Sequence, residues 1–311
     1  MLKRTLCAIL ALISVICAVS CSPTEDRDGY SIVCTVFPIY DWVSNLTAEL
    51  SEIEVTLIVD SGTDPHSYNA SADDIAAISS ADMLVYVGGE SDAWVSDVVK
   101  NLGDKAPKTV RLIDSVCEAE HGHTDEHGHE HSAYDEHVWL SLKNASALTK
   151  LIAEKLSVAM PENAELIKIN SDTYISKINE LDSYAEEAFS SAKSNILLFA
   201  DRFPFAYMAE DYSLECYAAF SGCSADSEAS FETVTSLAKK IDELSLSYVL
   251  VLESSDKRLA ETVISSSKAK NAEILVLDSM QSITEKDISS GLDYLSVMES
   301  NIKVIAKALG V

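Results

Sequence analysis

The chain has 311 residues, which is too long for one ordinary hydrophobic core and predicts two lobes of about 150 residues each. Hydrophobic residues make up 47% and charged residues 23%, so both lobes have enough apolar material for a core. The formal net charge of −27 argues against binding to nucleic acid or to an anionic lipid surface. It is compatible with a cationic ligand.

The N-terminal residues have the pattern of a lipoprotein signal peptide. A basic start at Lys3 precedes an apolar run over 5–20, which is shorter than the ~20 residues that a membrane-spanning helix requires. A small residue stands directly before Cys21, as in a lipobox, although Ala18 occupies the place where leucine is usual. We expect cleavage before Cys21 and lipidation of this residue, with an uncleaved anchor helix as the alternative. Residues 22–29 are polar and predict a flexible tether.

From residue 31 the sequence alternates apolar, strand-like runs with helix-like segments. The predicted strands are 31–36, 53–59, 82–87 and 109–112, and the predicted helices are 39–50, 71–80 and 91–101. This alternation indicates a parallel sheet covered by helices on both faces.

After a histidine-rich interruption come two predicted helices, 143–158 and a long one at about 162–192, with Pro161 in its first turn. The alternation then restarts. The predicted strands are 195–199, 214–219, 247–252 and 273–277, and the predicted helices are 204–212, 230–245, 256–269 and 285–309. The long helix, at roughly 45 Å, is expected to act as a rigid strut between two α/β lobes.

Functional loops of parallel sheets lie at the carboxyl ends of the strands, so two facing lobes predict a site in the cleft between them. We therefore divide the chain into a signal peptide (1–21), a tether (22–29), an N-terminal lobe (30–142) with a His-rich loop (118–134), a helical linker (143–193) and a C-terminal lobe (194–311).

Five of the seven histidines lie in one short stretch that contains two glycines. They are His121, His123, His127, His129 and His131. Imidazoles at this density bind borderline metals such as zinc, but their loose and redundant spacing defines no single geometry. We interpret this stretch as a metal-collecting loop, and not as the principal site.

The other two histidines each have an acid close by. His66 lies in the stretch Asp64-Pro-His-Ser-Tyr after a predicted strand, and His137 lies in Asp135-Glu136-His-Val-Trp. An acidic neighbour can hold the second ring nitrogen of a metal-binding histidine. Taken alone, these contexts leave a ligand role and a structural role about equally supported.

The order of motifs resembles the zinc/manganese-type solute-binding lipoproteins of bacterial ABC importers. The resemblance runs over nearly the whole chain after the signal: DPHSY, SADMLVYVGGESDAW, the His-rich loop, DEHVWLSLKN, the long helix and a second lobe. It implies one metal ion held between the lobes, with His66 and His137 as the first two ligands.

The remaining ligands are less clear, because the zinc-type members have a third histidine where this chain has Ala200. Manganese-type members use carboxylates, and the resemblance then points to Asp226 and Asp278 in loops of the second lobe. Glu228 and Cys223 are the alternatives to Asp226. A helix cap for Asp226 and a turn for Asp278 are their structural alternatives.

Two imidazoles and two carboxylates suit zinc and manganese almost equally. The His-rich loop favours Zn²⁺, with Mn²⁺ as the alternative, because manganese competes poorly for imidazole. The motifs HExxH, GxSxG and GxxxxGK[ST] do not occur, so we do not expect an enzyme. A metal-dependent hydrolase and a surface metal buffer or adhesin are the alternatives from other classes.

The resemblance also implies partners and a location. We expect a monomer that delivers its metal to an ABC importer permease and its ATPase. A lipid anchor would hold it on the outer face of the cytoplasmic membrane or on the periplasmic side.

Overall fold

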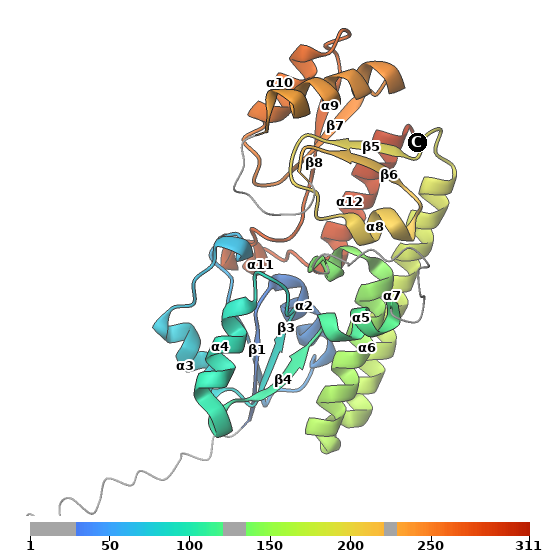
Figure 1. Cartoon of the computed structure of the whole chain (residues 1–311). Coiled ribbons are helices and arrows are strands. Elements are labelled where there is room, and N and C mark those ends of the chain that lie inside the picture. Colours follow the sequence, from blue (N-terminus) through green and yellow to red (C-terminus); the bar gives the residue numbers. More distant parts are fainter. Residues whose placement is uncertain (1–28, 121–134, 221–228) are drawn as a thin grey trace, which may run out of the picture.

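The computed structural model describes residues 29–120, 135–220 and 229–311, and shows two lobes arranged along one long helix (Figure 1). Each lobe contains a four-stranded sheet in which the paired strands are parallel. The first sheet has the order β2–β1–β3–β4, with β1 at Tyr30–Cys34, β2 at Ile53–Leu57, β3 at Met83–Tyr86 and β4 at Lys108–Arg111. The second has the order β6–β5–β7–β8, with β5 at Ile196–Phe199, β6 at Glu215–Ala218, β7 at Tyr248–Leu252 and β8 at Glu273–Leu277. The predicted fold class is confirmed.

Helices cover the sheets and join the lobes. Those of the first lobe are α2 (Phe37–Leu46), α3 (Ala72–Ser80), α4 (Ala93–Leu102) and α5 (Ile113–Glu120). Those between the sheets are α6 (Leu142–Ala159) and α7 (Ala164–Ser190). Those that follow are α8 (Ala206–Asp211), α9 (Phe231–Leu244), α10 (Arg258–Ser266), α11 (Glu285–Ser289) and α12 (Tyr294–Leu309).

Side chains alternate between the two faces of each sheet and divide the interior into clusters. Ile32 of β1 and Phe199 of β5 both belong to one large cluster. Val33 faces a smaller cluster under α3 and α4, and Leu198 faces another under α9 and α10. Because the large cluster also includes residues of α6, α7 and α12, the two lobes share one continuous core.

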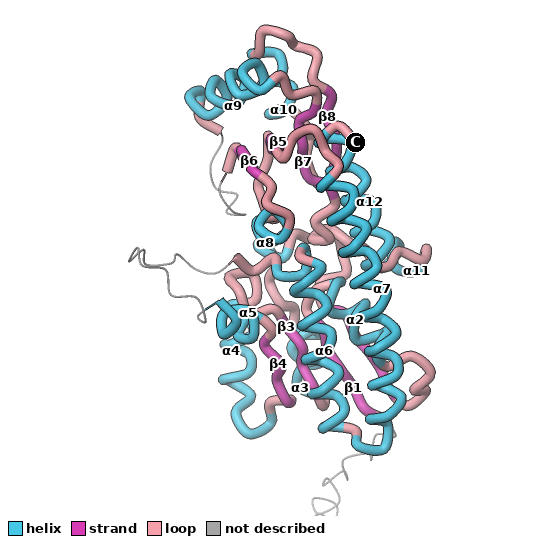
Figure 2. Tube along the Cα trace, turned by 90° about the vertical axis from the view of Figure 1, so that its right-hand side faces the viewer, coloured by secondary structure: helices cyan, strands magenta, loops and turns pink. Residues whose placement is uncertain are grey.

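The long helix α7 has 27 residues and a length of about 40 Å. Pro161 lies in the short 3₁₀ turn Pro161–Asn163 that leads into it. Packing against α2, α6 and α12 places α7 beside both lobes, as Figure 2 shows. This arrangement agrees with the predicted rigid strut.

The structure differs from the predicted elements at two places. The short helix α5 was not expected, and the single helix expected over 285–309 is divided into α11 and α12. Gly291 between them has a φ of 91°, which is outside the helical region, and Asp293 caps the start of α12. Within the described parts of the chain, no helix is both long enough and apolar enough to cross a membrane.

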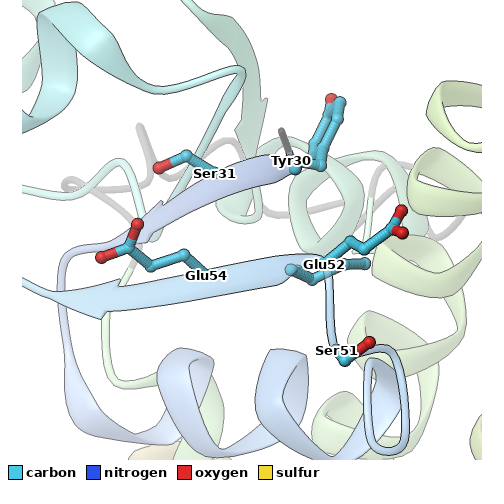
Figure 3. Close-up of a pocket in the computed structure, with 7 residues that line it drawn as sticks. Tyr30, Ser31, Ser51, Glu52 and Glu54 are labelled. Atoms are coloured by element: carbon cyan, nitrogen blue, oxygen red, sulfur yellow. The ribbon is translucent and has the colours of Figure 1, made fainter. Parts of the chain in front are cut away.

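A small pocket opens where β1 and β2 begin (Figure 3). His66, by contrast, follows the end of β2. The pocket is lined by Gly29, Tyr30, Ser31, Ser51, Glu52, Ile53 and Glu54. These residues include acids but neither an imidazole nor a thiol, so we assign no metal binding to this pocket.

Candidate metal centre

His66 lies on the loop that follows β2, in the short 3₁₀ turn Pro65–Ser67. Asp64 caps this turn, since its Oδ1 accepts a hydrogen bond from the His66 backbone N–H at 3.0 Å. Proline in the first turn fixes the local backbone angle. Asp64 and Pro65 therefore hold the backbone of His66 in place independently of its ring.

His137 directly precedes the 3₁₀ turn Val138–Leu140. The side chain is only 3% exposed, and its ring packs against Trp139 at a centroid distance of 5.2 Å. Asp135 Oδ1 accepts a hydrogen bond from the His137 backbone N–H at 2.9 Å. Both histidines are thus anchored by an acid two positions earlier.

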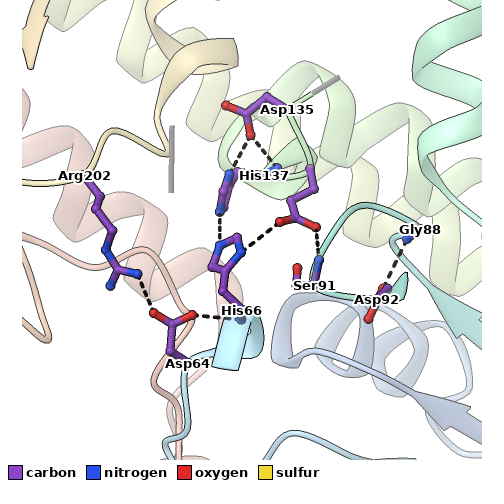
Figure 4. Close-up of polar contacts among 9 residues, drawn as sticks. Asp64, His66, Gly88, Ser91, Asp92, Asp135, His137 and Arg202 are labelled. Carbon is purple, nitrogen blue, oxygen red and sulfur yellow. Dashed lines mark hydrogen bonds and ion pairs between the residues drawn. The ribbon is translucent and has the colours of Figure 1, made fainter. Parts of the chain in front are cut away.

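The two imidazoles face each other (Figure 4). Their Nε2 atoms are 3.4 Å apart, and the ring centroids are separated by 5.4 Å. Two nitrogens bound to one tetrahedral zinc ion at 2.0–2.1 Å would be about 3.3 Å apart. The Nε2 pair is therefore spaced as two ligands of one metal ion would be.

Each Nδ1 atom contacts a carboxylate. His137 Nδ1 is 2.5 Å from Asp135 Oδ1, and His66 Nδ1 is 3.1 Å from Glu136 Oε1. The acid that holds the His66 ring is thus Glu136, and not the sequence neighbour Asp64, whose contact is with the backbone. Candidate ligand atoms of His66, Glu136 and His137 all lie within 4.8 Å of one another, which is compact enough for a metal ion.

Glu136 is itself fixed by the loop after β3. Its Oε2 accepts a hydrogen bond from the Ser91 backbone N–H at 2.9 Å. The buried Asp92 holds the same loop, because its Oδ2 accepts hydrogen bonds from the backbone N–H groups of Val87 and Gly88. Burial raises the pKa of Asp92 to about 6. Two strand-end loops of the first lobe, those after β2 and β3, and the segment 135–137 therefore meet at the two imidazoles.

The second lobe contacts this group through polar side chains. Arg202, in the loop after β5, donates to Asp64 Oδ2 at 2.6 Å, and Tyr207 donates to the Asp135 carbonyl oxygen at 3.0 Å. Burial alone would raise the pKa of Asp64, but the hydrogen bond and charge of Arg202 and the His66 backbone N–H hold it below its usual value. The two acids beside the histidines are thus tied to the opposite lobe.

Asp278 lies directly after β8, and its Oδ1 accepts a hydrogen bond from the Met280 backbone N–H at 2.8 Å. Burial and the nearby charge of Glu253 raise the pKa of Asp278 to about 6. The next residue, Ser279, accepts a hydrogen bond at its carbonyl oxygen from Trp139 Nε1 at 3.0 Å, so this loop adjoins the His137 turn. Asp278 is not in the compact group of His66, Glu136 and His137.

Apolar side chains surround Ala200, which stands where the zinc-type members have a third histidine. Ala200 is 1% exposed and belongs to the cluster under α9 and α10. Asp226, Glu228 and Cys223 lie outside the described residues, as do Cys21 and the five histidines of the collecting loop. Their predicted roles stay predictions.

Sequence reasoning missed the contact of Glu136 with His66 and the ion pair of Arg202 with Asp64. Glu136 is adjacent to His137 in sequence, and nothing in that adjacency indicates that its carboxylate reaches a ring 70 positions earlier. The departure from the family pattern at Ala200, two residues earlier, was the one available signal near Arg202.

Comparisons with known proteins show the family of this chain. A family model described as zinc-uptake complex component A, periplasmic, matches residues 32–308. The zinc-binding lipoprotein AdcA of Streptococcus pneumoniae R6 is 32% identical over 306 residues, which cover 96% of this chain and 59% of AdcA. The high-affinity zinc uptake system protein ZnuA of Bacillus subtilis 168 is 27% identical over 295 residues, with 93% of this chain and 90% of ZnuA covered. The chain thus spans less than two thirds of the AdcA relatives and most of this ZnuA.

Solved structures show the same architecture. The Zn(II)-bound ZnuA-like domain of S. pneumoniae AdcA superposes with a TM-score of 0.74 at 30% identity, covering 91% of this chain and 100% of that domain. The periplasmic zinc-binding protein TroA of Treponema pallidum superposes with a TM-score of 0.77 at 23% identity, covering 91% and 100%, and supports the fold alone. The matches confirm the predicted family, which is one of metal-uptake proteins and not of enzymes.

Proposed function

Because the chain belongs to the family of zinc-uptake complex component A, we propose that it captures Zn²⁺ outside the cytoplasm and delivers it to an ABC importer. The observation that carries this proposal is the facing pair of His66 and His137, whose Nε2 atoms are 3.4 Å apart. A carboxylate at each Nδ1 atom would keep the ring proton there and turn the Nε2 lone pair of each ring toward the other ring, where a metal would bind.

The second lobe is proposed to complete the coordination of the ion. Asp278 and Asp226 are the carboxylates we assign to it, with Glu228 and Cys223 as the alternatives to Asp226. The position of Asp278 after β8, in a loop that adjoins the His137 turn through Trp139, supports its assignment. Two neutral imidazoles and two carboxylates would neutralise a divalent cation, which suits a partly buried site.

Zinc is preferred to manganese in this proposal for two reasons. The AdcA and ZnuA relatives are named for zinc, and the chain carries the histidines of the stretch 121–131. Imidazole is a ligand that suits zinc, whereas carboxylate and water suit manganese. The stretch is proposed to collect zinc for the principal site.

The partners follow from the same assignment. A permease and its ATPase would receive the metal, and lipidation at Cys21 would keep the protein, as a monomer, at the outer face of the membrane. The predicted signal at the N-terminus and the family description as periplasmic support this location.

The test is metal analysis of the full chain purified without added metal, followed by competition between Zn²⁺ and Mn²⁺. We expect one tightly bound zinc ion per chain that excess manganese does not displace. The His66→Ala/His137→Ala double variant should lose this ion. Retention of the ion by the double variant, or displacement of zinc by manganese, would contradict the proposal.

A further inference from the structure

We propose that Glu136 is a positioning residue for the neighbouring ligand His66, and not a metal ligand itself. Its carboxylate would accept the Nδ1–H of His66 and so present Nε2 to the metal. This inference rests on the proposed function, because it assigns a role to a residue of the same site.

The first step concerns which nitrogen of His66 faces the metal. Its Nε2 is 3.4 Å from Nε2 of His137, whereas its Nδ1 is 3.1 Å from Glu136 Oε1. One ring nitrogen of a neutral imidazole carries the proton and the other has the free lone pair. With a metal at the Nε2 pair, the proton of His66 lies on Nδ1 and points at Glu136.

The second step is that His137 has the same arrangement. Its Nδ1 is 2.5 Å from Asp135 Oδ1, so Asp135 would fix the tautomer of its own neighbour. Two consecutive acids of one loop therefore hold two histidines from different loops. Carboxylates that hold the second ring nitrogen fix ring orientation and raise the basicity of a metal ligand.

The third step is that the loop after β3 is built around Glu136. The side chain of Glu136 is 7% exposed, and burial of a carboxylate is costly unless hydrogen bonds compensate for it. Ser91 N–H supplies one such bond to Oε2. A Cβ atom added at Gly89 would lie 2.3 Å from Glu136 Cβ and 2.2 Å from its Oε2, so only glycine leaves room here.

The fourth step separates positioning from ligation. Oε1 of Glu136 contacts His66 Nδ1, and Oε2 accepts from Ser91, so ligation would require the carboxylate to give up a contact. The backbone of His66 is held separately by Asp64. Loss of the Glu136 carboxylate should therefore free the ring of His66 and leave its backbone in place.

The experiment compares Glu136→Ala and Glu136→Gln with the unmodified full chain, and uses Asp41→Asn as a matched control. Asp41 is a carboxylate of the same lobe that is 8% exposed and accepts hydrogen bonds from Tyr174 and Asn45. Zinc affinity is measured by competition with a chelator. The His66 Nδ1–H resonance is measured by NMR of the zinc-loaded chain, and the coordination number by the absorption spectrum of the Co²⁺-loaded chain.

For Glu136→Ala we expect a loss of zinc affinity of about 10- to 100-fold, disappearance of the His66 Nδ1–H resonance and an unchanged Co²⁺ coordination number. Glu136→Gln should lose less zinc affinity, because its amide oxygen can still accept a hydrogen bond from the Nδ1–H of His66. Asp41→Asn should retain the affinity and the resonance of the unmodified chain.

Two results would overturn the inference. One is a Glu136→Ala chain with unchanged affinity and a retained resonance. The other is a changed Co²⁺ coordination number, which would make Glu136 a ligand. If Glu136→Ala does not fold, Glu136→Gln decides: the inference then requires a loss of zinc affinity with an unchanged Co²⁺ coordination number, and an unchanged affinity or a changed coordination number overturns it. Failure of the unmodified chain to bind zinc would instead refute the proposed function, so the two failures are distinguishable.

Discussion

In the first lobe, the loops after β2 and β3 and the residues 135–137 bring two imidazoles together and hold each ring with a carboxylate. The second lobe has the same strand order, but its corresponding loops carry acids and no histidine. In chain order, the segment between β6 and α9 corresponds to the segment of His66, and Asp226 falls within it in sequence, outside the described residues. The loop after β7 contains Glu253, whose carboxylate accepts hydrogen bonds from Ser279 N–H and Oγ–H.

With the ligands proposed above, the same strand order would support two kinds of ligand loop, one with imidazoles and one with carboxylates. In the first lobe, the burial of His137 and Glu136 and a carboxylate contact at each ring would preorganise the pair before a metal arrives. In the second lobe, Asp278 stands outside the compact group, so the metal would have to draw it in. We infer that the first lobe provides most of the affinity and that the second lobe completes the coordination.

The largest effect should therefore come from the imidazoles of the first lobe. His66→Ala or His137→Ala removes a ligand from the preorganised pair, and we expect zinc affinity to fall by more than the ~100-fold that loss of a supporting residue causes. Chelator competition measures this loss. His131→Ala is the control, since it removes an imidazole from the collecting loop and should leave the tight site intact.

A smaller loss is expected from the carboxylates of the second lobe. Asp226→Ala and Asp278→Ala should each weaken zinc binding by at least about tenfold, and titration calorimetry measures the change. Glu228→Ala and Cys223→Ser should weaken zinc binding much less. If Asp226→Ala leaves the zinc affinity unchanged and Glu228→Ala or Cys223→Ser lowers it strongly, that residue and not Asp226 is the third ligand.

The ion pair between the lobes should have a modest effect. Arg202→Met removes the donor to Asp64, whose side chain is 23% exposed, and we expect about 1–2 kcal/mol less stability at pH 7 and a loss of zinc affinity of a few-fold.

The sign of the pH dependence follows from the lowered pKa of Asp64. A carboxylate with a lowered folded-state pKa stabilises the fold above its ordinary pKa of about 4, and this contribution is lost as pH falls through the folded-state pKa. The stability difference between Arg202→Met and the unmodified chain, from urea unfolding, should therefore shrink below about pH 4. A difference that stays constant down to pH 2 would show that the ion pair is not its source.

The smallest effect on affinity should follow deletion of residues 121–131. The tight site should remain, because its residues lie elsewhere, but loading should slow when zinc is scarce, since the collecting loop raises the local concentration of metal. Stopped-flow transfer of zinc from a weak chelator measures the rate. Loss of the tight ion on deletion would show that the loop contains the principal site.

Much of the fold could be predicted because the strands are apolar runs between polar loops, a signal that the local sequence contains. The break at Gly291 and Asp293 was also visible locally, as a glycine and a helix cap, yet the surrounding helical periodicity outweighed it. The site was less predictable. The contact of Glu136 with His66 requires two loops to approach in space, and residue spacing carries no information about that approach.

The shared core also has a consequence for the order of folding. Tyr294, at the start of α12, packs edge-to-face against Trp42 of α2, with the ring centroids 5.4 Å apart. Its hydroxyl donates a hydrogen bond to the Trp139 carbonyl oxygen at 2.7 Å. The core of the first lobe thus includes a side chain that is synthesised about 250 residues after Trp42, and contacts at such separation slow folding. We expect the first lobe to remain incomplete on the nascent chain until α12 docks. The two imidazoles would then reach their final geometry only in the last stage of folding.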